Sequence, residues 1–336
     1  MLARSSKLRH PSGIVLETPL LVPSFSSKGF PVEKGGKSQV SLALKITSEA
    51  LTESMLISAF DIHHKYIPHP KKFTVAPQIT FVDSGGYETS QAFDFSAVSR
   101  NPFPIDEDWN APKLAATLDE WPERLPAAFV NFDHGSVRKP LKNQVDDARR
   151  FFARYPKHLS VFIIKPETKR QQYVQVPSIL GRVRELRHFD IIGITEKELG
   201  NSILERMENV ARIRQALTQA SVEAPIHVFG SLDPLTSCLY FLAGAEIFDG
   251  LTWLRYTYLD GASVYTHEFG ALNVGIHERD ALVRDMALMN NLFYLRRLQH
   301  EMRAFLLEFN FGQFSHHADL LERSYDSLCA NLGGRQ

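Results

Sequence analysis

Four aspartates, Asp61, Asp83, Asp133 and Asp249, each follow directly on a short apolar run. A carboxylate at the edge of a partly apolar cavity is costly unless it is paired or takes part in chemistry. Two carboxylates from separate strands suit displacement at the anomeric carbon of a sugar, where one attacks to form a covalent glycosyl intermediate and the other handles the proton. Both glycoside hydrolases and enzymes that exchange a nucleobase use this arrangement.

The residues after Asp83 favour a nucleobase over an oligosaccharide. In TFVDSGGYETS, residues 80–90, the aspartate precedes two glycines and Tyr87. The glycines leave clearance beside the backbone, and the tyrosine offers a flat face for stacking, with Phe229 able to close the other side. Sugar-binding barrels usually line their cleft with tryptophan, but none of the three tryptophans here is next to Asp83 or Asp133.

The elements that must position these residues are eight short apolar runs. Most lack strict alternation, which is typical of strands buried on both faces of a parallel sheet. The runs are residues 20–25, 55–60, 80–85, 128–133, 160–165, 190–195, 226–231 and 246–252.

Segments with helical periodicity lie between most of the runs, for example 141–155 and 204–217, the latter behind a predicted N-cap at Asn201. In a further segment Asp233 can cap a helix whose first residue is Pro234. Eight strands with crossover helices predict an α/β fold, a (β/α)8 TIM barrel. A doubly wound sheet is the alternative, but it would need a GxGxxG loop where the sequence reads PSFSSKGF.

We expect one domain over residues 1–336. A Pro-rich insertion of about 95–127 follows the third strand, and a long amphipathic helix over 279–309 lies within a C-terminal helical extension of about 279–330. In such a barrel the active site forms at the C-terminal ends of the strands. The predicted strand-end residues are Ser24, Asp61, Asp83, Asp133, Lys165, Thr195, Gly230 and Asp249.

Composition limits the partners and the compartment. Lys plus Arg and Asp plus Glu both number 38, so a nucleic-acid partner would require basic groups gathered on one face. The two cysteines, Cys238 and Cys329, lack CxxC spacing, which favours a reducing compartment over a thiolate metal site. The sequence shows neither a signal peptide nor an apolar run of 18 residues, so we expect a cytoplasmic protein with no membrane partner.

Several motifs, in order along nearly the whole chain, resemble those of the tRNA-guanine transglycosylases, the queuine and archaeosine tRNA-ribosyltransferase family. The most specific is VDSGGYE at 82–88, similar to the family's DSGG[FY]Q motif. The others are TPLLVPSF at 18–25, FDHGS at 132–136, the stretch 227–255 and NNLFYLRRLQHEMR at 290–303.

The resemblance implies roles for these residues. Asp249 would be the nucleophile on the ribose C1′ and Asp83 the general acid and base. Asp133 would bind the Watson–Crick edge of a purine held between Tyr87 and Phe229. The remaining base-binding residues would be Ser84, Gly85, Gly86, Glu88, Lys165 and Gly230, and the phosphate or substrate contacts would come from Arg255, Arg138 and Lys139.

The sequence also departs from the family pattern. The family holds a structural zinc with a CxCxxC cluster and a later histidine, whereas residues 256–290 contain no cysteine and Asn290 stands at the histidine position. We therefore predict no metal and no cofactor. Lys165-Pro-Glu167 replaces a Gln-Gly pair and Glu88 replaces a glutamine, so the pocket is charged. This favours a base other than plain guanine, such as a 7-substituted deazaguanine.

The predicted function is exchange or removal of a guanine or 7-deazaguanine base through a covalent aspartyl-ribosyl intermediate. The substrate would be tRNA, or a non-tRNA molecule such as DNA, a nucleoside or a deazapurine conjugate. Two alternatives stay open: a non-catalytic binding or regulatory subunit of the same fold, and a TIM-barrel glycoside hydrolase. The sequence is compatible with a homodimer or a partner subunit.

Overall fold

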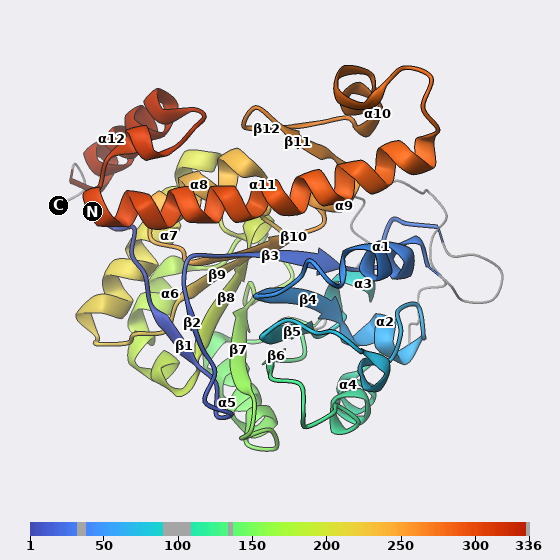
Figure 1. Ribbon diagram of the computed structural model, residues 1–336. Helices are drawn as coiled ribbons and strands as arrows, with labels where there is room; N and C mark the ends of the chain where they lie inside the picture. The colour runs from blue at the N-terminus through green and yellow to red at the C-terminus, as the bar shows by residue number, and fades with distance from the viewer. Residues whose placement is uncertain (32–37, 90–108, 134–136, 334–336) are drawn as a thin grey trace.

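A computed structural model describes residues 1–31, 38–89, 109–133 and 137–333. Eight parallel strands form a closed barrel in the order β10-β3-β4-β5-β6-β7-β8-β9 (Figure 1), which confirms the predicted (β/α)8 architecture. The strands are β3 (Leu20–Phe25), β4 (Ser54–Ser58), β5 (Ile79–Asp83), β6 (Ala127–Val130), β7 (Leu159–Ile164), β8 (Ile191–Thr195), β9 (Ile226–Phe229) and β10 (Ile247–Gly250).

The barrel interior is filled by alternate strand residues, as the period of two requires. One apolar cluster holds Leu20 and Val22 from β3, Ile79 and Phe81 from β5, and their counterparts on the other strands. The antiparallel hairpin of β1 (Lys7–Arg9) and β2 (Val15–Glu17) adds Leu8 and Leu16 to the same cluster. Beside it, the Ala127 amide at the start of β6 donates to His10 Nε2 at 3.3 Å, so the hairpin closes the N-terminal end of the barrel.

Helices between the strands bury one face against the outside of the barrel. They are α1 (Gln39–Thr47), α2 (Ala59–His63), α3 (Gly86–Thr89), α4 (Ala111–Asp119), α5 (Leu141–Phe152), α6 (Val176–Gly181), α7 (Ile203–Gln219) and α8 (Pro234–Leu242). Asp233 caps α8 through the amides of Leu235 and Thr236, as predicted. The N-cap of α7 is Ser202 and not Asn201, because the Ser202 hydroxyl is the group that accepts from the Glu205 amide.

The end of β4 differs from the sequence prediction. The β4 strand ends at Ser58, and the chain turns at once into α2, so Asp61 lies on a short helix one turn beyond the strand. In the segment of about 95–127 the described part contains α4, which follows an N-cap at Asn110. The rest of that predicted insertion, up to residue 108, lies outside the described residues.

The C-terminal part begins after β10 with α9 (Thr252–Arg255), the hairpin β11 (Thr257–Leu259) and β12 (Ala262–Val264), and α10 (Thr266–Phe269). The predicted long helix is α11 (Asp280–Glu308), which crosses the outside of the barrel along β3, and α12 (Ala318–Gly333) follows it (Figure 1).

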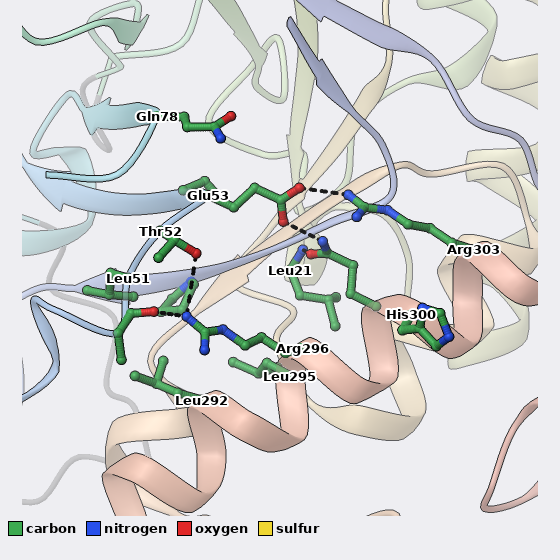
Figure 2. A pocket seen from close by; sticks show the side chains of 14 residues that line it. Leu21, Leu51, Thr52, Glu53, Gln78, Leu292, Leu295, Arg296, His300 and Arg303 are labelled. Atoms are coloured by element: carbon green, nitrogen blue, oxygen red, sulfur yellow. Dashed lines mark hydrogen bonds and ion pairs between the residues drawn. The ribbon is translucent and has the colours of Figure 1, made fainter. Parts of the chain in front are cut away.

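Polar side chains attach α11 to the chain before β4. Arg303 Nη2 lies 2.8 Å from Glu53 Oε1, and Gln299 donates to Glu53 Oε2 at 2.5 Å. Arg296 donates to the Ala50 carbonyl (Figure 2). These residues line a cavity of about 440 Å³ beside the N-terminal ends of β4 and β5. Arg296 and Arg303 therefore hold the helix on the barrel.

Within the described part of the chain, no helix is both long enough and apolar enough to cross a bilayer.

Candidate active site

Polar side chains gather at the C-terminal ends of the barrel strands, where a (β/α)8 fold forms its active site. Asp83 is the last residue of β5, and Asp249 lies within β10. Lys165 follows β7 directly, whereas Asp133 lies three residues beyond the end of β6. The structure thus brings both predicted catalytic carboxylates and Asp133 to one end of the barrel.

Three hydrogen-bond donors surround the Asp249 carboxylate, which is only 6% exposed. The Ser24 hydroxyl donates to Oδ2 at 2.8 Å. His227 Nε2 lies 2.9 Å from Oδ1, and the Gly230 amide donates to the same oxygen at 3.4 Å. These three contacts fix the orientation of the Asp249 carboxyl group.

Asp83 has the opposite environment. Burial is the largest cause that raises the pKa of Asp83, and the charges of Glu88, Asp133 and Asp249 add to it. The pKa of Asp83 therefore lies well above its usual range. The Gly85 amide, which donates to Oδ2 at 3.2 Å, opposes this rise only in part. The raised pKa favours the protonated form of Asp83, which is the form that a general acid needs.

Two further carboxyl groups lie behind Asp83. Asp61 is fully buried and accepts from both the amide and the hydroxyl of Ser27, yet burial raises its pKa to about 7. Burial and the nearby charge of Asp61 likewise raise the pKa of Glu88 to about 7, against a hydrogen bond from the Ser26 hydroxyl. These two acids, on α2 and α3, are joined to the segment after β3 through Ser26 and Ser27.

Asp133 belongs to a network of ion pairs. Lys165 Nζ lies 3.1 Å from Asp133 Oδ2 and 3.1 Å from Glu198 Oε2, and it donates to the Thr195 hydroxyl at 2.8 Å. Burial alone would lower the pKa of Lys165, but the two carboxylates outweigh it and the pKa is raised. The ammonium group thus fixes Asp133 at the mouth.

The phosphate residues predicted from sequence have different surroundings. Arg138 Nη2 lies 3.2 Å from Glu198 Oε1, so it joins the network at the mouth. Lys139 pairs with Asp147 of α5 at 2.6 Å, and 48% of its side chain is exposed.

Close packing explains the two glycines after Asp83. A Cβ atom on Gly86 would lie 2.4 Å from the Asp133 carbonyl oxygen. Gly85 has a φ of +86°, and a Cβ there would lie 2.6 Å from Trp109 Nε1. Neither position accepts a side chain without displacing the residues around it.

All three tryptophans are buried, and two of them support the mouth. Trp109 Nε1 donates to the Ser84 carbonyl at 2.9 Å, and Trp253 Nε1 donates to the Ser24 carbonyl at 3.0 Å. Trp121 packs against Phe129 in the core. The tryptophans therefore brace the backbone and do not line a sugar cleft.

The two aromatic residues predicted to hold a base lie in different settings. Phe229 points into the barrel and stacks on His227, with ring centroids 3.8 Å apart. Tyr87 lies on α3, where Lys28 Nζ sits 4.4 Å from its ring centroid. Arg255 Nη2 donates to the Tyr87 hydroxyl at 3.3 Å and to the Lys28 carbonyl at 3.0 Å.

Sequence reasoning missed His227 and Glu198. His227 is two residues before Phe229 on the same strand, so the period of two could have placed both side chains in the barrel interior. Glu198 lies on a single 3-10 turn, Glu196–Glu198, after β8, and no sequence pattern indicates which way such a turn points.

In the described residues, no group of three or more His, Cys, Asp or Glu side chains has the arrangement of a metal site. At the position where the resembling family has a zinc-binding histidine, Asn290 donates to the Tyr258 carbonyl at 2.9 Å. The neighbouring Asn291 bonds the Tyr258 amide and the Trp253 and Tyr256 carbonyls, each at 2.7 Å. Amide side chains thus connect α11 to the 253–258 segment.

No protein-family model matches the sequence, and the curated proteins contain no match to it.

Proposed function

We propose that this protein is a transglycosylase that exchanges or removes a guanine or 7-deazaguanine base through a covalent aspartyl-ribosyl intermediate. The observation that carries the proposal is the contrast between two neighbouring carboxyl groups. Burial and surrounding charges raise the pKa of Asp83, whereas three hydrogen-bond donors hold Asp249. A carboxyl group with a raised pKa and a second one oriented by hydrogen-bond donors suit the two roles, acid and nucleophile, that glycosyl transfer needs.

In the first step an Asp249 oxygen donates a lone pair to C1′ of the ribose. The bond from C1′ to the base nitrogen breaks, and its electron pair leaves with the base, which takes the proton of Asp83. An incoming base then gives its proton to the Asp83 carboxylate and attacks C1′, which frees Asp249. Attack by water at the same point would remove the base without replacing it.

Asp133 supports a purine as the base. Its Oδ1 accepts from the Ser84 hydroxyl and its Oδ2 pairs with Lys165, so its orientation is fixed while each oxygen keeps a second lone pair. Those lone pairs can accept N–H groups from the Watson–Crick edge of a guanine or 7-deazaguanine. A carrier of the base could be tRNA, DNA or a nucleoside.

The experiment is incorporation of labelled guanine into total tRNA, into double-stranded DNA and into free guanosine, each in a separate reaction. Asp249→Ala and Asp83→Asn should abolish incorporation, while Asp326→Asn, a change at an exposed position of α12, should leave it intact. Activity that persists in either active-site variant would contradict the mechanism, and no incorporation into any of the three acceptors would contradict the function.

A further inference from the structure

His227 is fully buried in the barrel interior, directly below Asp249. Its ring stacks on Phe229 with an interplanar angle of 23°, and the edge of Phe81 meets it at a centroid distance of 5.6 Å. Only Nε2 has a polar neighbour, Asp249 Oδ1 at 2.9 Å; Nδ1 has no hydrogen-bond partner among the described residues. Packing on both sides leaves the ring one orientation.

These contacts determine where the proton of the ring lies. An ionised carboxylate only accepts hydrogen bonds, so Nε2 must carry the hydrogen in the bond to Asp249. A second proton at Nδ1 would be buried without an acceptor, which costs free energy. With Asp249 as the ionised nucleophile of the proposed function, His227 is a hydrogen-bond donor with a fixed direction.

The two oxygens of Asp249 are not equivalent. Oδ1 accepts from two donors that cannot turn away, the His227 ring and the Gly230 amide. Of the described residues, only Ser24 donates to Oδ2, and its hydroxyl can rotate. In a glycosyl ester the carbonyl oxygen keeps its strength as an acceptor, whereas the oxygen bonded to the sugar loses most of it.

We propose that His227 is a positioning residue that holds Oδ1 as the future ester carbonyl and directs Oδ2 to C1′. This assignment of the attacking oxygen rests on the proposed function. In the step, a lone pair of Oδ2 forms the bond to C1′, and the bond from C1′ to the base breaks. Its electron pair leaves with the base, which takes the proton of Asp83, so the negative charge passes from Asp249 to Asp83. His227 keeps its hydrogen bond throughout and neither gains nor loses a proton.

Two variants at one position separate the donor from the ring. His227→Phe keeps a stacking ring and removes the donor, while His227→Gln loses the ring but keeps an amide N–H near the place of Nε2. Loss of one hydrogen bond to a charged group should lower kcat of guanine exchange about 10- to 100-fold in His227→Phe, with KM nearly unchanged. His227→Gln should recover most of that loss, even where it is the less stable variant. Equal loss in both variants, or a loss that follows their melting temperatures, would contradict the positioning role.

Measurements without substrate test the role of His227 independently of the proposed function. Nitrogen-15 NMR of the wild-type protein should show His227 protonated at Nε2 and bare at Nδ1, and a crystal structure of His227→Phe should show the Asp249 carboxylate rotated from its wild-type orientation. An unrotated carboxylate would overturn the role of His227 whether or not the protein exchanges bases. If the wild type exchanges no base but the carboxylate rotates, the proposed function fails and the positioning of Asp249 by His227 stands.

Discussion

Replacing Asp61 by asparagine should stabilise the protein at alkaline pH and have a smaller effect in acid. Asp61 is fully buried, and burial raises its pKa from 3.8 to about 7. Because the folded state binds this proton more tightly than the unfolded chain does, the stabilisation is complete below about pH 4 and is lost as pH rises through 7. Asparagine carries no charge at any pH, and its amide can donate to the Ser27 hydroxyl while its oxygen accepts from the Ser27 amide.

The expected magnitude follows from the pKa. The stability that the Asp61 proton contributes falls from pH 5 up to the folded-state pKa of about 7 and is constant above it, which is about two pH units. At about 1.36 kcal/mol per unit, the wild type loses ~3 kcal/mol between pH 5 and pH 8. An unfolding entropy of about 2.1 cal/mol/K per residue gives ~0.7 kcal/mol/K for 336 residues. The difference in melting temperature between Asp61→Asn and the wild type should therefore grow by about 4 °C from pH 5 to pH 8.

The assay is thermal unfolding followed by circular dichroism at both pH values. Asp326→Asn, at an exposed position of α12, is the matched control, and its effect should be the same at both. An Asp61→Asn effect that does not change with pH would refute the account of a buried acid cluster behind Asp83.

Three other changes test different parts of the structure. Lys165→Met should lower the free energy of unfolding by about 3–5 kcal/mol in urea titrations, since it takes from Asp133 its ion pair with Lys165 and leaves Glu198 with Arg138 alone. A loss below 1 kcal/mol would contradict the network. Burial lowers the pKa of His158 to about 4, so the stability that its neutral form contributes is present above pH 6.5 and is lost as pH falls through 4. His158→Leu should therefore flatten the acid side of a plot of melting temperature against pH. An unchanged acid side would contradict this prediction. In Gly193→Ala the new Cβ would lie 2.5 Å from Phe229 Cε2, so we expect a cost of about 1–3 kcal/mol and a raised KM for guanine; an unaltered KM would remove Phe229 from the base site.

The strands could be predicted from the sequence because burial on both faces of the sheet requires continuous apolar runs. The run at 20–25 coincides with β3, and the carboxylates Asp83 and Asp249 could be placed at the mouth from chain order alone. Asp61 could not, because a strand that ends at Ser58 and one that continues to Phe60 have the same apolar pattern.

The hydrogen-bond partners of the carboxylates could not be predicted from the sequence. The contacts of Asp249 with Ser24 and His227 span 225 and 22 positions of the chain, and they depend on which strands become neighbours in the closed barrel. The Trp253 indole reaches the Ser24 carbonyl across 229 positions for the same reason. The predicted barrel makes these strands neighbours, but which side chains meet depends on the register between the strands and on side-chain direction, which apolar runs do not encode.

The most direct test of the central claim is detection of the covalent intermediate. The wild-type protein is incubated with tRNA, DNA or guanosine, denatured in acid, digested with nuclease and protease, and analysed by mass spectrometry. The account predicts a ribosyl or deoxyribosyl adduct on the peptide that contains Asp249, present in the wild type and absent from Asp249→Ala. An adduct on another residue, or base exchange that proceeds without any adduct on Asp249, would contradict it.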